Sequence, residues 1–83
     1  MLAELGYWRI IGRAPGTKPV HALCAEMEPE DAVRLTLTAA RATNPNVKPE
    51  GWRFWCRRLG VRGWVRWLRF SVVDGRARRL FNE

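Results

Sequence analysis

Arginine and tryptophan are interleaved through the segment Trp52–Phe70, and these two residue types together suit the binding of a phosphate-rich partner. The arginine guanidinium is planar, so it can form two parallel hydrogen bonds to a phosphate or stack on a ring. Tryptophan adds a flat aromatic face on which a nucleobase can lie. We therefore predict a binding surface made by one group of C-terminal residues: Arg53, Arg57, Arg58, Arg62, Arg66, Trp67, Arg69, Arg76, Arg78 and Arg79.

The distribution of charge points to the same segment. The protein has 83 residues and a formal net charge of +7. Its first 50 residues contain six basic and six acidic side chains, whereas residues 51–83 contain nine arginines against two acids, Asp74 and Glu83. Because all of the excess positive charge lies in the last 33 residues, the sequence predicts an acidic partner.

The residues that most enzymes and metal sites need are scarce. His21 is the only histidine and Ser71 the only serine, and neither lies in a motif that activates a nucleophile. Cys24 and Cys56 are the other soft ligands, and their spacing from His21 does not fit a zinc motif. The acids of Glu26–Asp31 lie before or within the first turn of a predicted helix, and its dipole explains them. The sequence therefore predicts a non-enzymatic protein without catalytic residues, a metal or a cofactor.

Nucleic acid is the partner that this chemistry favours most. The sequence contains no zinc finger, KH loop or other recognition motif, so we predict binding to DNA or RNA with little sequence specificity. The choice between DNA and RNA stays open. No small-molecule substrate is expected.

Two other interpretations use the same residues. Tryptophan and arginine are enriched at interface hot spots, so the partner could be an acidic protein or a ribonucleoprotein complex. Small proteins without motifs are often encoded by phages and mobile elements, and some, such as anti-CRISPR proteins, act as inhibitors or adaptors in this way. The second alternative is an anionic membrane surface, into which Arg/Trp segments also partition.

The elements that must position these side chains begin with a hairpin. Gly6–Arg13 is rich in aromatic and β-branched residues, Ala14–Pro19 contains a Pro-Gly turn signal, and Val20–Met27 is the expected return strand. A helix is predicted over Pro29–Thr43, because proline and acids suit its first turn and Asn44-Pro45 ends it. Its apolar face is expected to contain Ala32, Val33, Leu35, Leu37, Ala39 and Ala40.

The Arg/Trp segment begins with a stretch that fits two structures. Residues 52–59 place apolar side chains at helical spacing, with Gly60 as a helix cap, and also at the alternate positions of a strand. The pattern therefore does not decide between helix and strand for residues 52–59.

The rest of the segment favours strands. Trp64–Val73 is rich in β-forming residues, and a strand here turns Trp67 and Arg69 outward. Asp74-Gly75 is typical of a two-residue type I′ turn, so Arg76–Phe81 should pair with the preceding strand. The face toward the helix is then expected to contain Trp64, Arg66, Leu68, Phe70 and Val72.

Together these elements predict a small α+β single domain over residues 1–83, with its basic part at 51–83. One antiparallel sheet, made of the N-terminal hairpin and the C-terminal strands, carries the one main helix on one face. Hydrophobic residues make up 47% of the chain, and several of the five tryptophans are expected in the core. Because the sequence shows no secretory signal, no long apolar run and only two cysteines, we expect a cytoplasmic protein.

Overall fold

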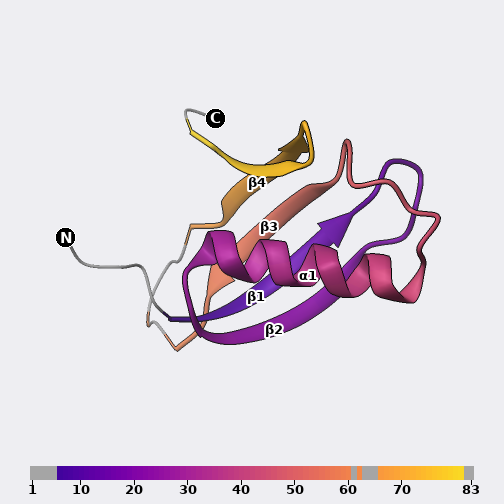
Figure 1. Ribbon diagram of the computed structural model, residues 1–83. Helices are drawn as coiled ribbons and strands as arrows, with labels where there is room; N and C mark the ends of the chain where they lie inside the picture. Colours follow the sequence, from indigo (N-terminus) through magenta and orange to yellow (C-terminus); the bar gives the residue numbers. More distant parts are fainter. Residues whose placement is uncertain (1–5, 61, 63–65, 82–83) are drawn as a thin grey trace.

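A computed structural model describes residues 6–60, 62 and 66–81, and this part of the chain forms one helix and five strands (Figure 1). The fold is the α+β arrangement that the sequence predicts. The N-terminal hairpin and the helix have the predicted bounds. The elements are β1 (Gly6–Arg13), β2 (Val20–Met27), α1 (Pro29–Thr43), β3 (Arg53–Arg58), β4 (Leu68–Val73) and β5 (Arg76–Leu80).

The five strands form one antiparallel sheet in the order β2-β1-β3-β4-β5. Strands adjacent in the sheet are also adjacent in sequence, except for β1 and β3, which are separated by β2 and α1. These two strands form the middle of the sheet, where residues 8–13 lie opposite residues 53–58 without a gap. The topology therefore brings the N-terminal and the Arg-rich parts of the chain side by side.

Helix α1 covers one face of the sheet and ends where the sequence predicts. Pro29 occupies the first turn with Glu30 and Asp31, and the Asn44 backbone N–H donates to the Ala40 carbonyl (3.0 Å) at the C-terminus. The residues that it buries are spaced three and four apart: Pro29, Ala32, Val33, Thr36 and Leu37.

The helix face is narrower than predicted. Leu35 is 53% exposed and Ala39 is also exposed, so these two residues do not contribute to the core. At 3.6 residues per turn, both positions are rotated away from the stripe that contacts the sheet. Ala40 is half-buried and packs against the core, as predicted.

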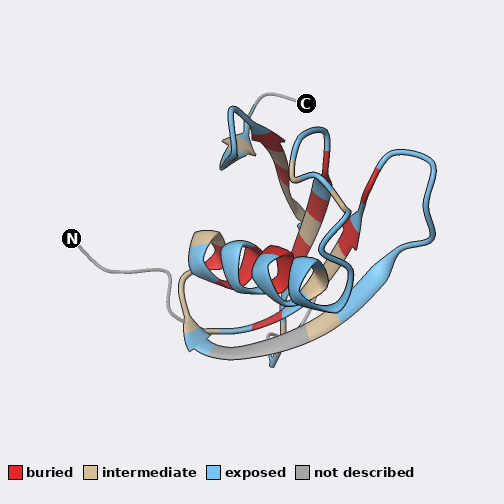
Figure 2. Cartoon of the chain, turned by 45° about the vertical axis from the view of Figure 1, so that its right-hand side comes forward, coloured by how far each residue is buried: buried red, intermediate tan, exposed pale blue. Residues whose placement is uncertain are grey.

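The core lies between α1 and the inner side of the sheet, where the buried residues of both gather (Figure 2). Trp8 and Trp52 are each only 3% exposed. Their indole N–H groups donate to the carbonyls of Met27 (2.9 Å) and Lys48 (2.8 Å), which satisfies the only polar atom of each side chain. Two of the five tryptophans are therefore core residues, as predicted. The strand residues buried with them are Ile10, Phe54, Cys56, Phe70 and Val72.

Gly12 makes room for the fully buried ring of Phe54. It lies directly opposite Phe54 in the β1–β3 pair, and Phe54 stacks on Trp52 with 5.6 Å between ring centroids. A Cβ atom on Gly12 would lie 2.5 Å from the Phe54 ring, far inside van der Waals contact. The absence of a side chain at Gly12 therefore permits the aromatic ring to fill the centre of the sheet.

The structure decides the ambiguity at residues 52–59 in favour of a strand. Arg53–Arg58 is β3, and Gly60 (φ +77°) lies in a bend after the strand instead of capping a helix. Pairing with β1 on one side and β4 on the other explains this outcome, because both sets of contacts are non-local.

Strand β4 is shorter than predicted. It begins at Leu68, opposite Cys56, so Arg66 and Trp67 precede it, and residues 64 and 65 lie outside the described residues. The following turn has the predicted type I′ geometry, with positive φ at Asp74 (55°) and Gly75 (73°).

Candidate functional site

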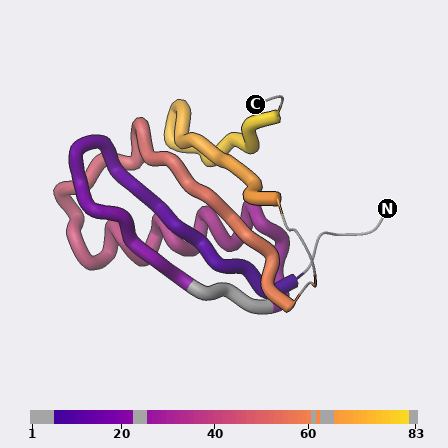
Figure 3. The backbone as a smooth tube through the Cα atoms, turned by 180° about the vertical axis from the view of Figure 1, so that it is seen from behind, coloured from indigo at the N-terminus to yellow at the C-terminus, as the bar shows by residue number. Residues whose placement is uncertain are grey.

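The side of the sheet opposite α1, the open face from here on, has no described element packed over it. In the view from behind, the strands lie in front and the helix is on their far side (Figure 3). Strand periodicity places every second residue on this face. Register aligns these residues in rows that run, from β1 toward β5, as Arg13–Arg53–Ser71–Arg78, then Ile11–Trp55–Arg69–Leu80, then Arg9–Arg57.

The open face is strongly cationic. Strands β1, β3, β4 and β5 contain no Asp or Glu at all. Seven arginines take outward positions on them: Arg9, Arg13, Arg53, Arg57, Arg69, Arg76 and Arg78. The helix side differs, because there Asp31 pairs with Arg34 (3.2 Å) and Glu30 with Arg79 (3.8 Å).

Two pairs of arginines lie directly opposite each other on the central strands. Arg13 faces Arg53, and Arg9 faces Arg57. Side chains in such positions have Cβ atoms about 5 Å apart, and like charges there are destabilising. Within residues 6–60, 62 and 66–81, none of these four arginines has a carboxylate partner. The centre of the open face is therefore a place where a bound anion would relieve repulsion.

Each arginine pair borders a shallow hollow that also contains an indole. Arg13 and Arg53 line a hollow of about 550 Å³ with Trp55 and the Ala14–Gly16 turn, and we call it the Trp55 hollow. The Trp67 hollow, of about 310 Å³, lies at the other end of the same strands. Its lining residues are Arg9, Ile11, Arg57, Arg58, Leu59, Gly60 and Trp67.

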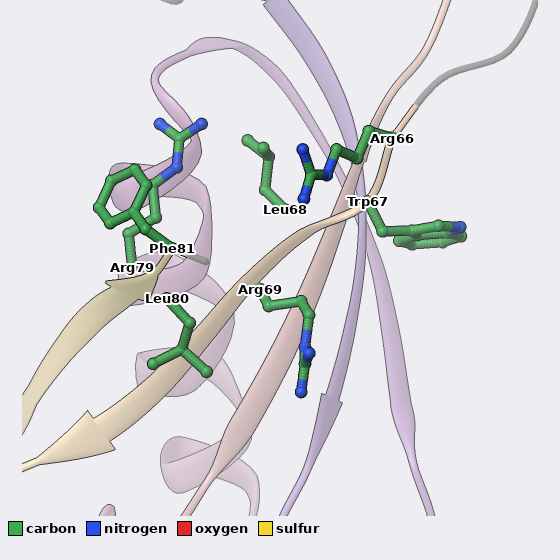
Figure 4. A pocket seen from close by; sticks show the side chains of 7 residues that line it. All are labelled: Arg66, Trp67, Leu68, Arg69, Arg79, Leu80 and Phe81. Carbon is green, nitrogen blue, oxygen red and sulfur yellow. The ribbon is translucent and has the colours of Figure 1, made fainter. Parts of the chain in front are cut away.

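A third hollow, the edge hollow, lies at the end of β4 and β5 and has a volume of about 350 Å³ (Figure 4). Arg79 stacks on Phe81, with 5.2 Å between the guanidinium carbon and the ring centroid. In Figure 4, Trp67 points away from the Arg79–Phe81 pair. Arg69 and Leu80 extend to the side of the sheet opposite that pair. The residues that line the edge hollow therefore lie on both sides of the sheet, and this hollow does not belong to the open face alone. Its lining residues are Arg66, Trp67, Leu68, Arg69, Arg79, Leu80 and Phe81.

The residues predicted from the sequence divide into three groups. The group on or beside the open face is the largest, and it consists of Arg53, Arg57, Trp67, Arg69, Arg76 and Arg78. Arg62 and Arg66 are exposed and belong to the connection between β3 and β4. Arg58 and Arg79 have the inward parity of their strands. Arg58 lies over the Trp8 ring (5.9 Å), and Arg79 contacts Glu30.

Three residues of the open face were missed by the sequence reasoning. Arg9 and Arg13 lie in the N-terminal half, whose net charge of zero concealed them, and Trp55 lies in the stretch whose structure was ambiguous. The available signal was the alternation in Gly6–Arg13, which turns Arg9, Ile11 and Arg13 away from Trp8 and Ile10.

The described residues include no close group of metal ligands and no membrane-spanning helix, and they line one further hollow. No three His, Cys, Asp or Glu side chains among them gather closely enough to hold a metal ion. No described helix is long and apolar enough to cross a membrane. A further hollow of about 380 Å³ lies between α1 and β2, and its lining is mainly apolar or uncharged, including Val20, Ala40 and Val47.

Comparison with known proteins adds no relative. No protein family matches the sequence, and neither the curated proteins nor the solved structures include a significant match.

Proposed function

We propose that this protein is a non-enzymatic nucleic-acid-binding protein that uses the open face with little sequence preference. The observation that carries the proposal is the two pairs of like-charged arginines, Arg13–Arg53 and Arg9–Arg57, opposite each other on a face where strands β1, β3, β4 and β5 contain no carboxylate. The repulsion within each pair opposes folding slightly. A bound polyanion would turn this unfavourable electrostatic energy into a favourable one, because each arginine would then face a negative charge. Functional sites are where local stability rules are expected to be broken.

The distribution of the arginines fits a phosphate backbone better than a single anion. The outward guanidinium groups belong to four strands, so they are spread across the width of the sheet. Each phosphate that they neutralise releases condensed counterions, which supplies affinity without reading the sequence. If about four phosphates are engaged, the logarithm of the binding constant falls with a slope of about −3 to −4 against the logarithm of salt concentration.

The aromatic residues favour nucleic acid over an acidic protein. Trp55 and Trp67 are half-buried, and each lines a hollow beside an arginine pair. Indole faces and guanidinium groups bind features that all nucleotides share, the base rings and the phosphates. This combination supports binding that tolerates any sequence.

Titration of the full chain against labelled random oligonucleotides at several salt concentrations tests the proposal. The double variant Arg13→Ala/Arg53→Ala should weaken binding and reduce the magnitude of the salt slope by about 1.5 to 2, because two phosphate contacts are lost. The control Arg34→Ala/Arg41→Ala removes the same charge from exposed helix positions and should leave the slope nearly unchanged.

Two results would contradict the proposal. One is the absence of binding at low salt, and binding to an acidic polypeptide or to anionic vesicles under those conditions would then identify the partner class. The other is an equal loss in both double variants, because it would mean that total charge matters and the open face does not.

A further inference from the structure

The Trp55 and Trp67 hollows repeat one arrangement. Each contains one indole and one arginine from β1 opposite one arginine from β3. The two arginine pairs are four residues apart on both strands, with Ile11 opposite Trp55 between them. At a rise of about 3.3 Å per residue, the pairs are about 13 Å apart along the strands.

We infer that the open face selects single-stranded nucleic acid and that the two hollows are equivalent subsites, each taking one unpaired base on its indole and a neighbouring phosphate on its arginine pair. This inference rests on the proposed function. It adds to that function the class of nucleic acid that is bound and the residues that determine this selectivity.

Stacking on an indole requires an exposed base face. In a duplex each base is covered above and below by its neighbours, about 3.4 Å apart along the strand, so only base edges are accessible in the grooves. A single strand can turn its bases out of the stack, and single-strand-binding proteins place such bases on aromatic side chains. A single strand can therefore supply bases to two indole hollows, beside arginine pairs about 13 Å apart, without breaking base pairs.

The width of the sheet also disfavours a duplex. Five strands at a spacing of about 4.8 Å are about 19 Å wide. The major groove of B-DNA is about 12 Å wide and admits a helix or a two-stranded ribbon. The centre of the open face can therefore reach only the outer phosphates of a duplex, and its indoles would contribute nothing to that contact.

Trp55 presents its ring differently from the two core tryptophans. Trp8 and Trp52 are buried and hydrogen-bonded, and Trp8 also lies under Arg58. Trp55 is half-buried, and within the part of the chain that the structure describes no aromatic ring or guanidinium stacks on it. The ring beside the Arg13–Arg53 pair is thus open to a partner.

The test compares single-stranded and duplex oligonucleotides of the same length and sequence, as DNA and as RNA, at one salt concentration. The unmodified chain should bind a single strand roughly 10-fold or more tightly than the duplex, since stacking of one base changes affinity by roughly 5- to 150-fold. Trp55→Leu should lower single-strand affinity within that range and leave duplex affinity and the salt slope unchanged.

Two further variants make the result specific to the ring. Trp55→Phe keeps an aromatic face and should retain most of the single-strand affinity. Phe81→Leu makes the matched change from aromatic to aliphatic at a residue that is 69% exposed and outside both hollows, so it should have no effect. Trp67→Leu should reproduce the Trp55→Leu result at the second subsite.

The outcomes separate the two proposals. Failure to bind any oligonucleotide overturns the proposed function and this inference with it. Equal affinity for single strand and duplex overturns only the inference, and so does a folded Trp55→Leu chain with unchanged single-strand affinity. A parallel loss for both ligands also overturns it, because that pattern indicates a structural role for the ring.

Discussion

The two faces of the sheet are built from the same strands but differ in how their side chains are packed and paired. On the inner face, Phe54 and Phe70 are opposite each other and at most 1% exposed, and the buried tryptophans have hydrogen-bonded indole nitrogens. In the neighbouring pair of the same two strands, on the open face, Trp55 is opposite Arg69. The inner face satisfies packing and hydrogen bonding, whereas four arginines of the open face (Arg9, Arg13, Arg53 and Arg57) have no carboxylate partner among the described residues.

Arginine side chains have different neighbours on the two sides of the sheet. Arg34 and Arg79, on the helix side, are within ion-pair distance of Asp31 and Glu30. Arg13 and Arg53, on the open face, lie directly opposite each other. Under the proposed function, stability depends on the inner face and binding on the open face, and substitutions can test that division directly.

Truncation of the core should have the largest effect. Phe54→Ala removes a fully buried ring from the central strand and its stack with Trp52, so we expect a loss of about 3–5 kcal/mol in the free energy of unfolding. Urea denaturation measures the loss. The adjacent, exposed Arg53→Ala should stay within about 0.5 kcal/mol of the original. Similar losses at both positions would mean that the two faces are not separable.

Filling the space at Gly12 should have an intermediate effect. The added methyl of Gly12→Ala would overlap the Phe54 ring, and relief of that overlap should cost about 1–3 kcal/mol of stability. Phe54→Leu in the same chain should recover part of this cost, because the smaller side chain makes room for the methyl. A thermal melt of the three variants measures the coupling, and strictly additive effects would exclude the proposed fit.

The smallest effect on stability is expected on the open face. Trp67→Ala with Arg69→Ala should leave the melting temperature nearly unchanged, because both side chains lie on or beside the open face and outside the core. The same double variant should bind oligonucleotides at least several-fold more weakly, as one stacking face and one cation are lost. A chain that unfolds, or one that folds and binds normally, would disprove the assignment of these residues to the binding face.

Most of the fold could be predicted from local sequence signals. The Pro-Gly turn, the start of the helix at Pro29, its end at Asn44 and the Asp74-Gly75 turn all depend on residues close together in the chain. Residues 52–59 could not be assigned in this way, because their apolar side chains fit both periodicities. Non-local pairing of β3 with β1 and β4 determines their structure.

The candidate site was less predictable for the same reason. The excess of positive charge in residues 51–83 predicts Arg53 and Arg57 as site residues. The first 50 residues have a net charge of zero, so the same criterion does not indicate any residue there. Arg9 and Arg13 join the site only because β1 is placed beside β3, an arrangement that no local pattern encodes. Conversely, Arg79 is close in sequence to Arg78, yet strand alternation places it on the helix side, within ion-pair distance of Glu30.

Strand β5 forms one border of the sheet, and its composition has a consequence for self-association. An unpaired border strand can add to the same strand of another copy and begin aggregation, and closely spaced positive charges oppose this. Three of the five residues of β5 are arginines, so two copies joined along this border would bring six guanidinium groups together. The basic character of the C-terminal strand therefore also limits the growth of the sheet into larger assemblies, and it does so most effectively at low ionic strength.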